Sequence, residues 1–412
     1  MPAQTDRRTF LKKLGGFVVA TAAGPVVLDA FVPGAVRAAW ALDPLTDTLP
    51  LGTPICVMIT LDGGNDGLNT VVPVNNPWYY DASAGHGSVA LPSSQTLALN
   101  GSSDYRLHPK LTWLANRWNS VGDVAIVQGV GERNVKSFSH FDSMAFWQTG
   151  DTSLLERLGW MGRFNDAVRP GNPLATVALS DLRPEAVGAS SPTLVLQDTA
   201  DFQYELPWLD PNRFRAGLDL MATNAGPSFL GQTAKLISTT FSVSARVKGA
   251  TDGAVTAGGP YADITNRLLQ AALLIRAGIP SQTYTAAFGP FDSHDQQLQM
   301  QSDRFTELNE ALTKFFAGLA GHARERDVFV MIVSEFGRQV TANETGGTDH
   351  GQGGLAIVIG NGARRGFYGQ APTLDPGGPT RPNRIYDALV PTVDFRSMHA
   401  TAMNRLTGNT NV

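Results

Sequence analysis

The most informative stretch for the architecture is Ile55-Cys56-Val57-Met58-Ile59-Thr60-Leu61, followed directly by Asp62-Gly63-Gly64-Asn65-Asp66-Gly67. Its first part is apolar apart from one threonine, which indicates a strand that is buried on both faces. The glycine-rich part that follows indicates a turn or loop. The stretch therefore predicts an interior strand whose carboxyl end opens into a polar loop.

The same pattern recurs along the chain. Apolar runs bounded by glycine or charge predict further strands at 123–128, 327–334 and 355–359, and stretches with helical spacing predict helices at 264–277 and 301–323. Alternation of buried strands with amphipathic helices is typical of a three-layer α/β/α sandwich with a mostly parallel central sheet. In such a sheet, ligands bind at the carboxyl ends of the strands.

One region departs from this alternation. Residues 182–260 contain fewer strand signals, several prolines, among them Pro207, Pro211 and Pro227, and a stretch rich in Gly, Ala and Thr at 249–259. We interpret it as a helical insertion with a flexible loop, placed within one α/β domain that spans residues 42–412.

The N-terminus resembles a twin-arginine export signal. Arg7-Arg8-Thr9-Phe10-Leu11-Lys12 follows the RRxFLK pattern, and the mildly apolar segment 14–32 contains glycines, a proline and an aspartate. Small residues allow cleavage after Ala38 or Ala41. The prediction is a signal peptide over residues 1–41, the twin-arginine translocase as a partner, a periplasmic or extracellular location and no stable membrane span after cleavage. The alternative is a folded N-terminal helix or a permanent anchor.

Charge and cysteine content narrow the function classes. The chain has a net charge of −4 and shows no cluster of Lys and Arg, which argues against nucleic acid as a partner. Its single cysteine, Cys56, excludes an intramolecular disulfide.

Polar clusters follow predicted strands at 62–69, 137–142 and 334–351, and a further cluster at 291–295 follows the run 284–288. Carboxylates and imidazoles from separate strand ends are suitable ligands for a divalent metal such as Zn, Mg, Mn or Ca. A serine near such an ion can act as a nucleophile.

Each cluster also has a simpler interpretation. Asp66 can be a turn former, and Ser139 can be the N-cap of a helix that begins at His140. Asp292-Ser293-His294 can be a polar loop, whereas Arg338 can pair with Glu335 or with Glu344.

Together, these segments resemble the DUF1501 family, a group of exported bacterial proteins whose fold is similar to that of the alkaline phosphatase and sulfatase superfamily. The resemblance rests on Leu61 to Pro73 (LDGGNDGLNTVVP), Leu107-His108-Pro109, Ser139-His140-Phe141, Trp147 to Gly150 (WQTG), Asp292-Ser293-His294, Ser334 to Arg338 (SEFGR) and Gly347 to Gly351 (GTDHG).

The resemblance implies a set of site residues. The metal ligands that it implies are Asp66, with Asp62 as the rival, and Asp292, His294, Glu335, Asp349 and His350. Its catalytic residues are Ser139, with Ser137 as the rival, together with His140 and Arg338. Phe336 stands where the superfamily has a metal-binding histidine, which is a departure at the second metal position.

The function that this set implies is metal-dependent hydrolysis of a phosphate or sulfate ester in a small molecule or polymer, with Arg338 stabilising the charge that develops on the ester oxygens. The alternative is a non-catalytic binding or assembly protein of the cell envelope that keeps the same fold.

Overall fold

The computed structural model describes residues 42–408 apart from residues 44, 136, 180, 197–209, 225–227, 252–261 and 382–386. The predicted signal peptide, residues 1–41, lies outside the described residues. None of the described helices combines the length and apolarity that crossing a membrane requires.

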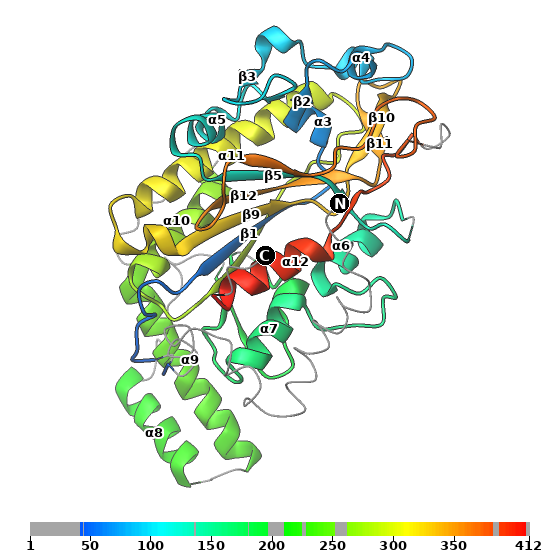
Figure 1. The fold of residues 1–412 in the computed structure, drawn as a ribbon. Helices are drawn as coiled ribbons and strands as arrows, with labels where there is room; N and C mark the ends of the chain where they lie inside the picture. The colour runs from blue at the N-terminus through cyan, green and yellow to red at the C-terminus, as the bar shows by residue number, and fades with distance from the viewer. Residues whose placement is uncertain are drawn as a thin grey trace.

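A nine-stranded sheet forms the centre of the molecule (Figure 1). Its main path runs in the order β13 (Gly366–Gly369), β5 (Val124–Gly131), β12 (Gly354–Gly360), β9 (Val328–Val333), β1 (Ile55–Leu61), β8 (Thr283–Phe288), β6 (Thr176–Leu179) and β7 (Thr193–Leu196), and β14 (Val393–Asp394) pairs with β5. Every pairing is parallel except the two that β12 makes with β5 and β9. The predicted mostly parallel sheet is therefore confirmed, with β12 as its reversed strand.

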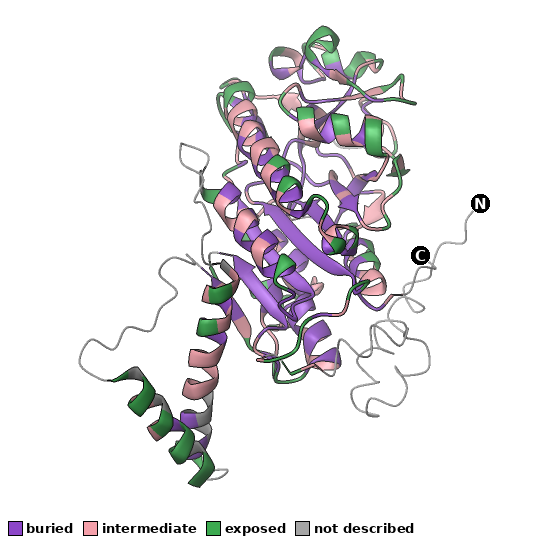
Figure 2. Ribbon diagram, turned by 90° about the vertical axis from the view of Figure 1, so that its left-hand side faces the viewer, coloured by how far each residue is buried: buried purple, intermediate pink, exposed green. Residues whose placement is uncertain are grey.

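The alternation of side chains along β1 explains why the sheet is covered on both faces. Val57 and Ile59 belong to one buried apolar cluster, whereas Cys56 and Met58 belong to another. Successive residues of a strand point to opposite faces, so a strand that is apolar throughout needs a helical layer on each side. The first layer contains α5 (Thr112–Asn116), α10 (Ala262–Arg276) and α11 (Gln297–Leu319), and the second contains α6 (His140–Thr149), α7 (Trp160–Val168) and α12 (Arg396–Leu406). Figure 2 shows the buried sheet between these helices.

The predicted strands and helices agree with the observed ones to within a few residues at each end. In α10, Ile264, Leu268, Ala271 and Ile275 are buried at helical spacing, which is the pattern that predicted the helix. The chain thus forms the predicted three-layer sandwich.

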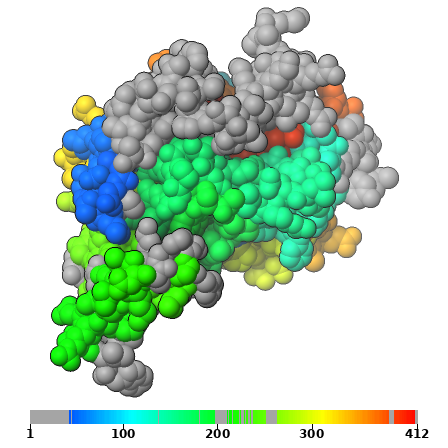
Figure 3. All heavy atoms as spheres, turned by 90° about the horizontal axis from the view of Figure 1, so that it is seen from below, coloured from blue at the N-terminus to red at the C-terminus, as the bar shows by residue number. Residues whose placement is uncertain are grey.

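The region predicted as a helical insertion, 182–260, contains both sheet and helix. Its first part supplies the edge strand β7, and its later part forms α8 (Pro211–Asn224) and α9 (Phe229–Thr251). The two helices pack against each other and project from the body, bright green at the lower left of Figure 3. Val243 and Val247 of α9 join the main core at the base of this hairpin.

Two small sheets lie beyond the carboxyl edge of the main sheet. One joins β2 (Val71–Pro73), β4 (Tyr105–Leu107) and β3 (Leu97–Ala98), and the other pairs β10 (Arg338–Ala342) with β11 (Thr348–His350). The short helices α3 (Gly67–Thr70) and α4 (Pro77–Tyr80) accompany the first.

Candidate metal centre

The loops after β1, β8 and β9 meet at one edge of the sheet because these three strands are parallel neighbours. Gly63 permits the closest approach. Its φ is +119°, and a Cβ at this position would lie 2.5 Å from the backbone nitrogen of Asp292, so only glycine fits without displacing the neighbouring backbone.

Three histidines and one aspartate converge at this edge. The Nε2 atom of His350 lies 3.0 Å from Nε2 of His140 and 2.9 Å from Nε2 of His294. The Asp292 carboxylate completes the group, because Oδ1 is 3.1 Å from His350 Nε2 and 3.0 Å from His294 Nε2, and Oδ2 is 3.4 Å from His140 Nε2. His140, Asp292 and His350 meet the geometry of a metal-binding group. His294 is not part of that group, but its Nε2 lies beside His350 and Asp292.

Each of these histidines has an oxygen acceptor at its other ring nitrogen. The Nδ1 atoms of His140 and His294 lie 2.9 Å from Glu335 Oε1 and from Asp349 Oδ1. The Nδ1 atom of His350 lies 2.7 Å from the carbonyl oxygen of Phe138. Each Nδ1 must carry a hydrogen to donate to its acceptor. When the rings are neutral, each Nε2 therefore has a lone pair, and these lone pairs point towards one another and towards the Asp292 carboxylate. A cation between them would remove this repulsion, and a histidine held by an outer carboxylate or carbonyl is the usual form of a metal ligand.

The charges around the cluster act in different directions on its members. The hydrogen bond to Glu335 raises the pKa of His140, whereas burial lowers the pKa of His350. Burial by itself would raise the pKa of Asp292, but Arg338 and the neighbouring histidines hold it below its usual range. Asp292 is therefore a carboxylate, as a ligand must be.

Glu335 and Asp349, which the sequence predicts as ligands, stand behind the histidines. Oε1 of Glu335 also accepts from the Gly63 backbone at 2.8 Å, and Oε2 lies 3.0 Å from Ser334 Oγ. Asp349 holds His294 from the solvent side. In this structure both carboxylates contact imidazoles on the side away from the converging Nε2 atoms, so their role as direct ligands stays a prediction.

Asp66 has partners outside the cluster. Its Oδ1 caps α3 by accepting from the backbone of Leu68, and its Oδ2 lies 2.9 Å from His86 Nε2 and 2.6 Å from Gln297 Nε2. The carboxylate is buried and its oxygens already have these partners. The rival, Asp62, also has a cation, because Arg183 donates to both of its oxygens at 3.1 Å.

Arg338, which the resemblance assigns to the ester oxygens of the substrate, lies inside the protein. Its side chain is fully buried, and it donates to the carbonyl oxygens of Gly64 at 2.7 Å and Thr348 at 3.0 Å and to Asp292 Oδ1 at 2.5 Å. The guanidinium ties the three loops together. The predicted pairing with Glu335 or Glu344 is not what the structure shows, since the partner is Asp292.

Ser139 is the N-cap of α6, as the simpler interpretation predicts. Its Oγ accepts from the Asp142 backbone at 3.4 Å. The rival Ser137 donates instead to Asp142 Oδ2 at 3.2 Å. Ser139 nevertheless lies between Phe138, whose carbonyl holds His350, and His140, so its backbone borders the cluster.

An open cleft of about 630 Å³ adjoins the cluster. His140, Asp292 and Glu335 line it, and so do Arg267 of α10 and Arg304 of α11. Each arginine is held over the end of β8, since Arg267 donates to the carbonyl of Ala287 at 2.8 Å and Arg304 to that of Gly289 at 3.3 Å. No motif in the sequence marks these two arginines, because they lie on the surface of ordinary amphipathic helices.

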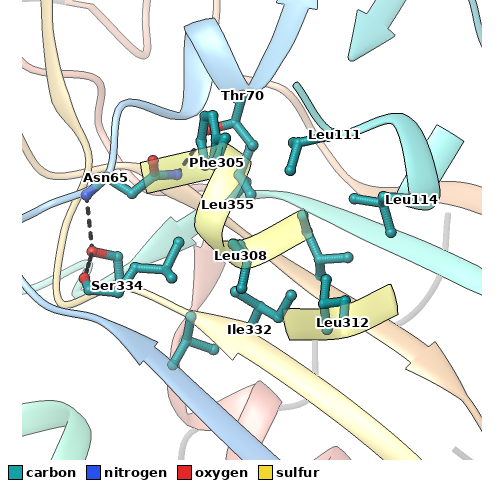
Figure 4. A pocket seen from close by; sticks show the side chains of 13 residues that line it. Asn65, Thr70, Leu111, Leu114, Phe305, Leu308, Leu312, Ile332, Ser334 and Leu355 are labelled. Atoms are coloured by element: carbon teal, nitrogen blue, oxygen red, sulfur yellow. Dashed lines mark hydrogen bonds between the residues drawn. The ribbon is translucent and has the colours of Figure 1, made fainter. Parts of the chain in front are cut away.

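A second, buried cavity lies between α11 and the sheet (Figure 4). Its volume is about 10 Å³ and its lining is mostly apolar, so it holds one water at most. At its edge, the backbone nitrogen of Asn65 donates to Ser334 Oγ at 2.9 Å, which joins the loops after β1 and β9. This cavity is a packing feature, whereas the cleft beside the cluster is open to solvent.

Comparison with known proteins places the chain in a family. No curated protein matches the sequence. Among solved structures, the chain is similar to the PsFucS1 sulfatase from Pseudoalteromonas sp. (13% identity over 90% of this chain and 71% of that chain, TM-score 0.37) and to the C-terminal periplasmic domain of EcEptC from Escherichia coli in a complex with Zn (10% identity over 89% and 87%, TM-score 0.35). It is also similar to a protein in the alkaline phosphatase superfamily from Vibrio parahaemolyticus (9% identity over 88% and 77%, TM-score 0.35).

These likenesses are distant. The family model described as a protein of unknown function, DUF1501, matches residues 128–410, which include His140, Asp292, His294 and His350, and the chain therefore belongs to the DUF1501 family.

Proposed function

We propose that this protein is a metal-dependent hydrolase of phosphate or sulfate esters whose centre consists of His140, His294, His350 and Asp292. The observation that carries the proposal is the convergence of three Nε2 atoms whose Nδ1 atoms are all held by oxygen acceptors. Hydrogen bonds among neutral imidazoles do not stabilise such an arrangement, whereas a shared cation does.

The donor set favours a borderline metal. Three imidazole nitrogens and one carboxylate suit Zn or Mn, whereas Ca and Mg prefer sites made of oxygen. Zn–N bonds of about 2.0 to 2.1 Å in a tetrahedron place nitrogens ~3.3 Å apart. The Nε2 atom of His350 lies 2.9 Å from that of His294 and 3.0 Å from that of His140, so each of these two pairs is close to that spacing. His294 lies outside the group of His140, Asp292 and His350, whose ligand atoms are all within 4.8 Å of one another, and its ring would have to move to become a fourth ligand.

The cleft gives the substrate its place. When bound, the metal supplies polarisation of the ester oxygens. Arg267 and Arg304 line the cleft, whereas Arg338 does not. We assign to these two arginines the recognition of anionic groups of the substrate. Both retain a carboxylate partner, Asp263 and Glu307, at 2.8 Å. The opening of the cleft to solvent suits the ester of a small molecule or of a polymer.

The nucleophile in this proposal is Ser139. Its cap interaction at 3.4 Å uses the oxygen as an acceptor and leaves the hydroxyl hydrogen free. None of the hydrogen bonds in the described part of the chain joins Ser139 Oγ to the four ligands, so water is the rival nucleophile.

The location of the protein is part of the same proposal. The twin-arginine pattern at residues 7–12 supports export by the twin-arginine translocase to the periplasm or beyond. This route carries folded proteins, so the centre would be loaded before export.

Phe336 supports a second candidate function, that of a non-catalytic binding or assembly protein of the cell envelope. Its ring packs 4.9 Å from the ring of His140 and 5.1 Å from that of His350. The apolar ring therefore stands at a position where a second metal ion would need a ligand.

Metal content and ester hydrolysis test the proposal together. We would purify the exported protein without an affinity tag and measure bound metals by elemental analysis, beside a His294→Ala, His350→Ala double variant. The matched control is His322→Ala, because His322 caps a short helix before β9 and belongs to no cluster at the strand ends.

One bound ion in the wild type and in the His322 variant, lost in the double variant, is the expected result. Hydrolysis of aryl phosphate or aryl sulfate that follows the metal content would then establish the enzyme. A well-folded wild type without metal would reject the proposal, and metal binding without hydrolysis of any ester would favour the binding protein.

A further inference from the structure

A buried polar group lies beneath the metal centre. His86 and Gln297 are fully buried and Asp66 is 2% exposed. Nε2 of His86 faces Asp66 Oδ2 at 2.9 Å, and its Nδ1 faces the carbonyl of Val340 at 2.5 Å. Both ring nitrogens therefore need a hydrogen, which makes His86 an imidazolium paired with the Asp66 carboxylate.

Gln297 connects this ion pair to the loops that carry the metal ligands. Its Nε2 donates to Asp66 Oδ2 at 2.6 Å. Its Oε1 accepts from Ser293 Oγ at 3.0 Å and from Thr348 Oγ1 at 2.6 Å. Ser293 stands between the ligands Asp292 and His294, and Thr348 is two residues before His350.

The amide is the chemical group that these contacts require. Asp66 accepts only, so it needs the donor end of Gln297, and the two hydroxyls then donate to the oxygen end. A hydrocarbon side chain at this position would leave a buried carboxylate and two buried hydroxyls without these partners. Backbone hydrogen bonds join the same segments, because Gln297 N donates to Gly346 O and Thr348 N donates to Ser293 O, both at 3.0 Å.

We propose that Gln297 is a positioning residue of the metal centre, which holds the loop of Asp292 and His294 in register with the loop of His350 by anchoring both on the Asp66 and His86 pair. The inference rests on the proposed metal function. It attributes the arrangement of the Nε2 atoms in part to a residue whose hydrogen bonds reach none of them. Loss of such outer support typically weakens metal affinity by about 10-fold to 100-fold.

The test compares two glutamines one turn apart on α11. Gln297→Met removes the amide and retains the length and volume of the side chain. Gln301→Met is the control, because Gln301 is 3% exposed and donates to the backbone carbonyl of Asp66 at 3.0 Å, but its hydrogen bonds do not reach the ligand loops. We would measure the Zn affinity of each full-length protein by competition with a chelating dye and the visible spectrum of the Co(II) form.

The expected result is a Zn affinity lowered by about 10-fold to 100-fold and a changed Co(II) spectrum in Gln297→Met, with the Gln301 variant close to wild type. Equal affinities and spectra in all three proteins would overturn the inference while leaving the metal function intact. If Gln297→Met fails to fold, the double variant Ser293→Ala, Thr348→Val decides, because it removes the two hydroxyl contacts and keeps the contact with Asp66.

Hydrogen exchange separates this inference from the metal function. In the metal-free proteins, the amides of 292–294 and 346–350 should exchange faster in Gln297→Met than in the Gln301 variant. A wild type that binds no metal would reject the proposed function, and the exchange rates would still decide whether Gln297 holds the loops. Unchanged exchange in that case would reject the positioning role.

Discussion

The Nε2 atoms of His294 and His350 lie 2.9 Å apart, although the other ring nitrogen of each is held by an oxygen, from Asp349 and from the carbonyl of Phe138. The two rings therefore cannot both turn to relieve the contact. The proposed metal centre accounts for this contact, and the roles of the surrounding residues can be tested.

Glu335 should behave as an orienting carboxylate. Glu335→Gln keeps an oxygen for His140 Nδ1 and should weaken metal affinity by about 10-fold to 100-fold, whereas His140→Ala should abolish specific binding. Competition titration with a chelating dye measures both, with Glu325→Gln on the surface as the control. Complete loss of metal in Glu335→Gln would restore the interpretation of Glu335 as a direct ligand.

Arg338 should matter for stability. Arg338→Gln leaves the carbonyls of Gly64 and Thr348 and the Asp292 carboxylate without their donor, and should lower the free energy of unfolding by at least about 3 kcal/mol. Urea unfolding of the metal-free proteins measures this change. An unchanged unfolding midpoint with a raised KM for esters would mean that Arg338 contacts the substrate after all.

The two buried histidines His86 and His108 should respond to pH in opposite directions. Burial alone would lower the pKa of His86, but Asp66 and the Val340 carbonyl outweigh it, with a smaller contribution from Asp387, so that the pKa is raised above 6.5. Its contribution to stability is then fully present below pH 6.5 and is lost as the pH rises through the raised value. His86 lowers the pKa of Asp66, although burial acts in the opposite direction. The stabilisation by this pair is therefore also lost in acid, as the pH falls below the ordinary pKa of an aspartate.

Burial lowers the pKa of His108 to about 4, so the unfolded chain binds its proton more readily and stability falls as the pH drops from about 6.5 towards 4. Urea unfolding of His86→Gln and His108→Gln between pH 4 and pH 9 tests both signs. The His86 variant should be about 3–5 kcal/mol less stable than wild type at pH 6, with a smaller difference at pH 9. A difference that grows with pH would contradict the ion pair.

Arg267 should contribute to anion binding. Arg267→Gln removes one charged donor from the cleft and should weaken the binding of inorganic phosphate to the metal-loaded protein by about tenfold. Arg276→Gln is the matched control, because Arg276 lies on the same helix and donates to the carbonyl of Gly318 away from the cleft. Calorimetric titration measures both, and equal dissociation constants for the two variants would remove Arg267 from the site.

The variant Ser139→Ala distinguishes a helix-capping role of Ser139 from a role as the nucleophile. Loss of the cap should lower the free energy of unfolding by about 1 kcal/mol. Loss of a nucleophile should in addition abolish ester hydrolysis, whereas Ser137→Ala should leave it measurable. If both variants hydrolyse aryl phosphate and aryl sulfate at the wild-type rate, water is the nucleophile.

The pattern of apolar residues was enough to predict the layers of the fold. A strand such as Ile55 to Leu61, apolar on both faces, has to be covered on both sides, and the helical spacing in α10 and α11 supplies one of the covers. Parallel strands place their carboxyl ends together, which made the polar residues after the predicted strands candidates for a site. The resemblance to the DUF1501 family then singled out Asp292, His294 and His350 as metal ligands and His140 as a catalytic residue.

The role of each polar side chain at the site follows from long-range contacts in the folded protein. Asp66 is paired by His86, 20 residues along the chain, and by Gln297, 231 residues away, and Arg338 receives its acceptors from loops that no local pattern links to it. Whether a carboxylate binds a metal, orients an imidazole or pairs with a buried cation depends on what lies within about 3 Å of each oxygen. Those distances arise from long-range packing, which periodicity and spacing along the chain do not specify.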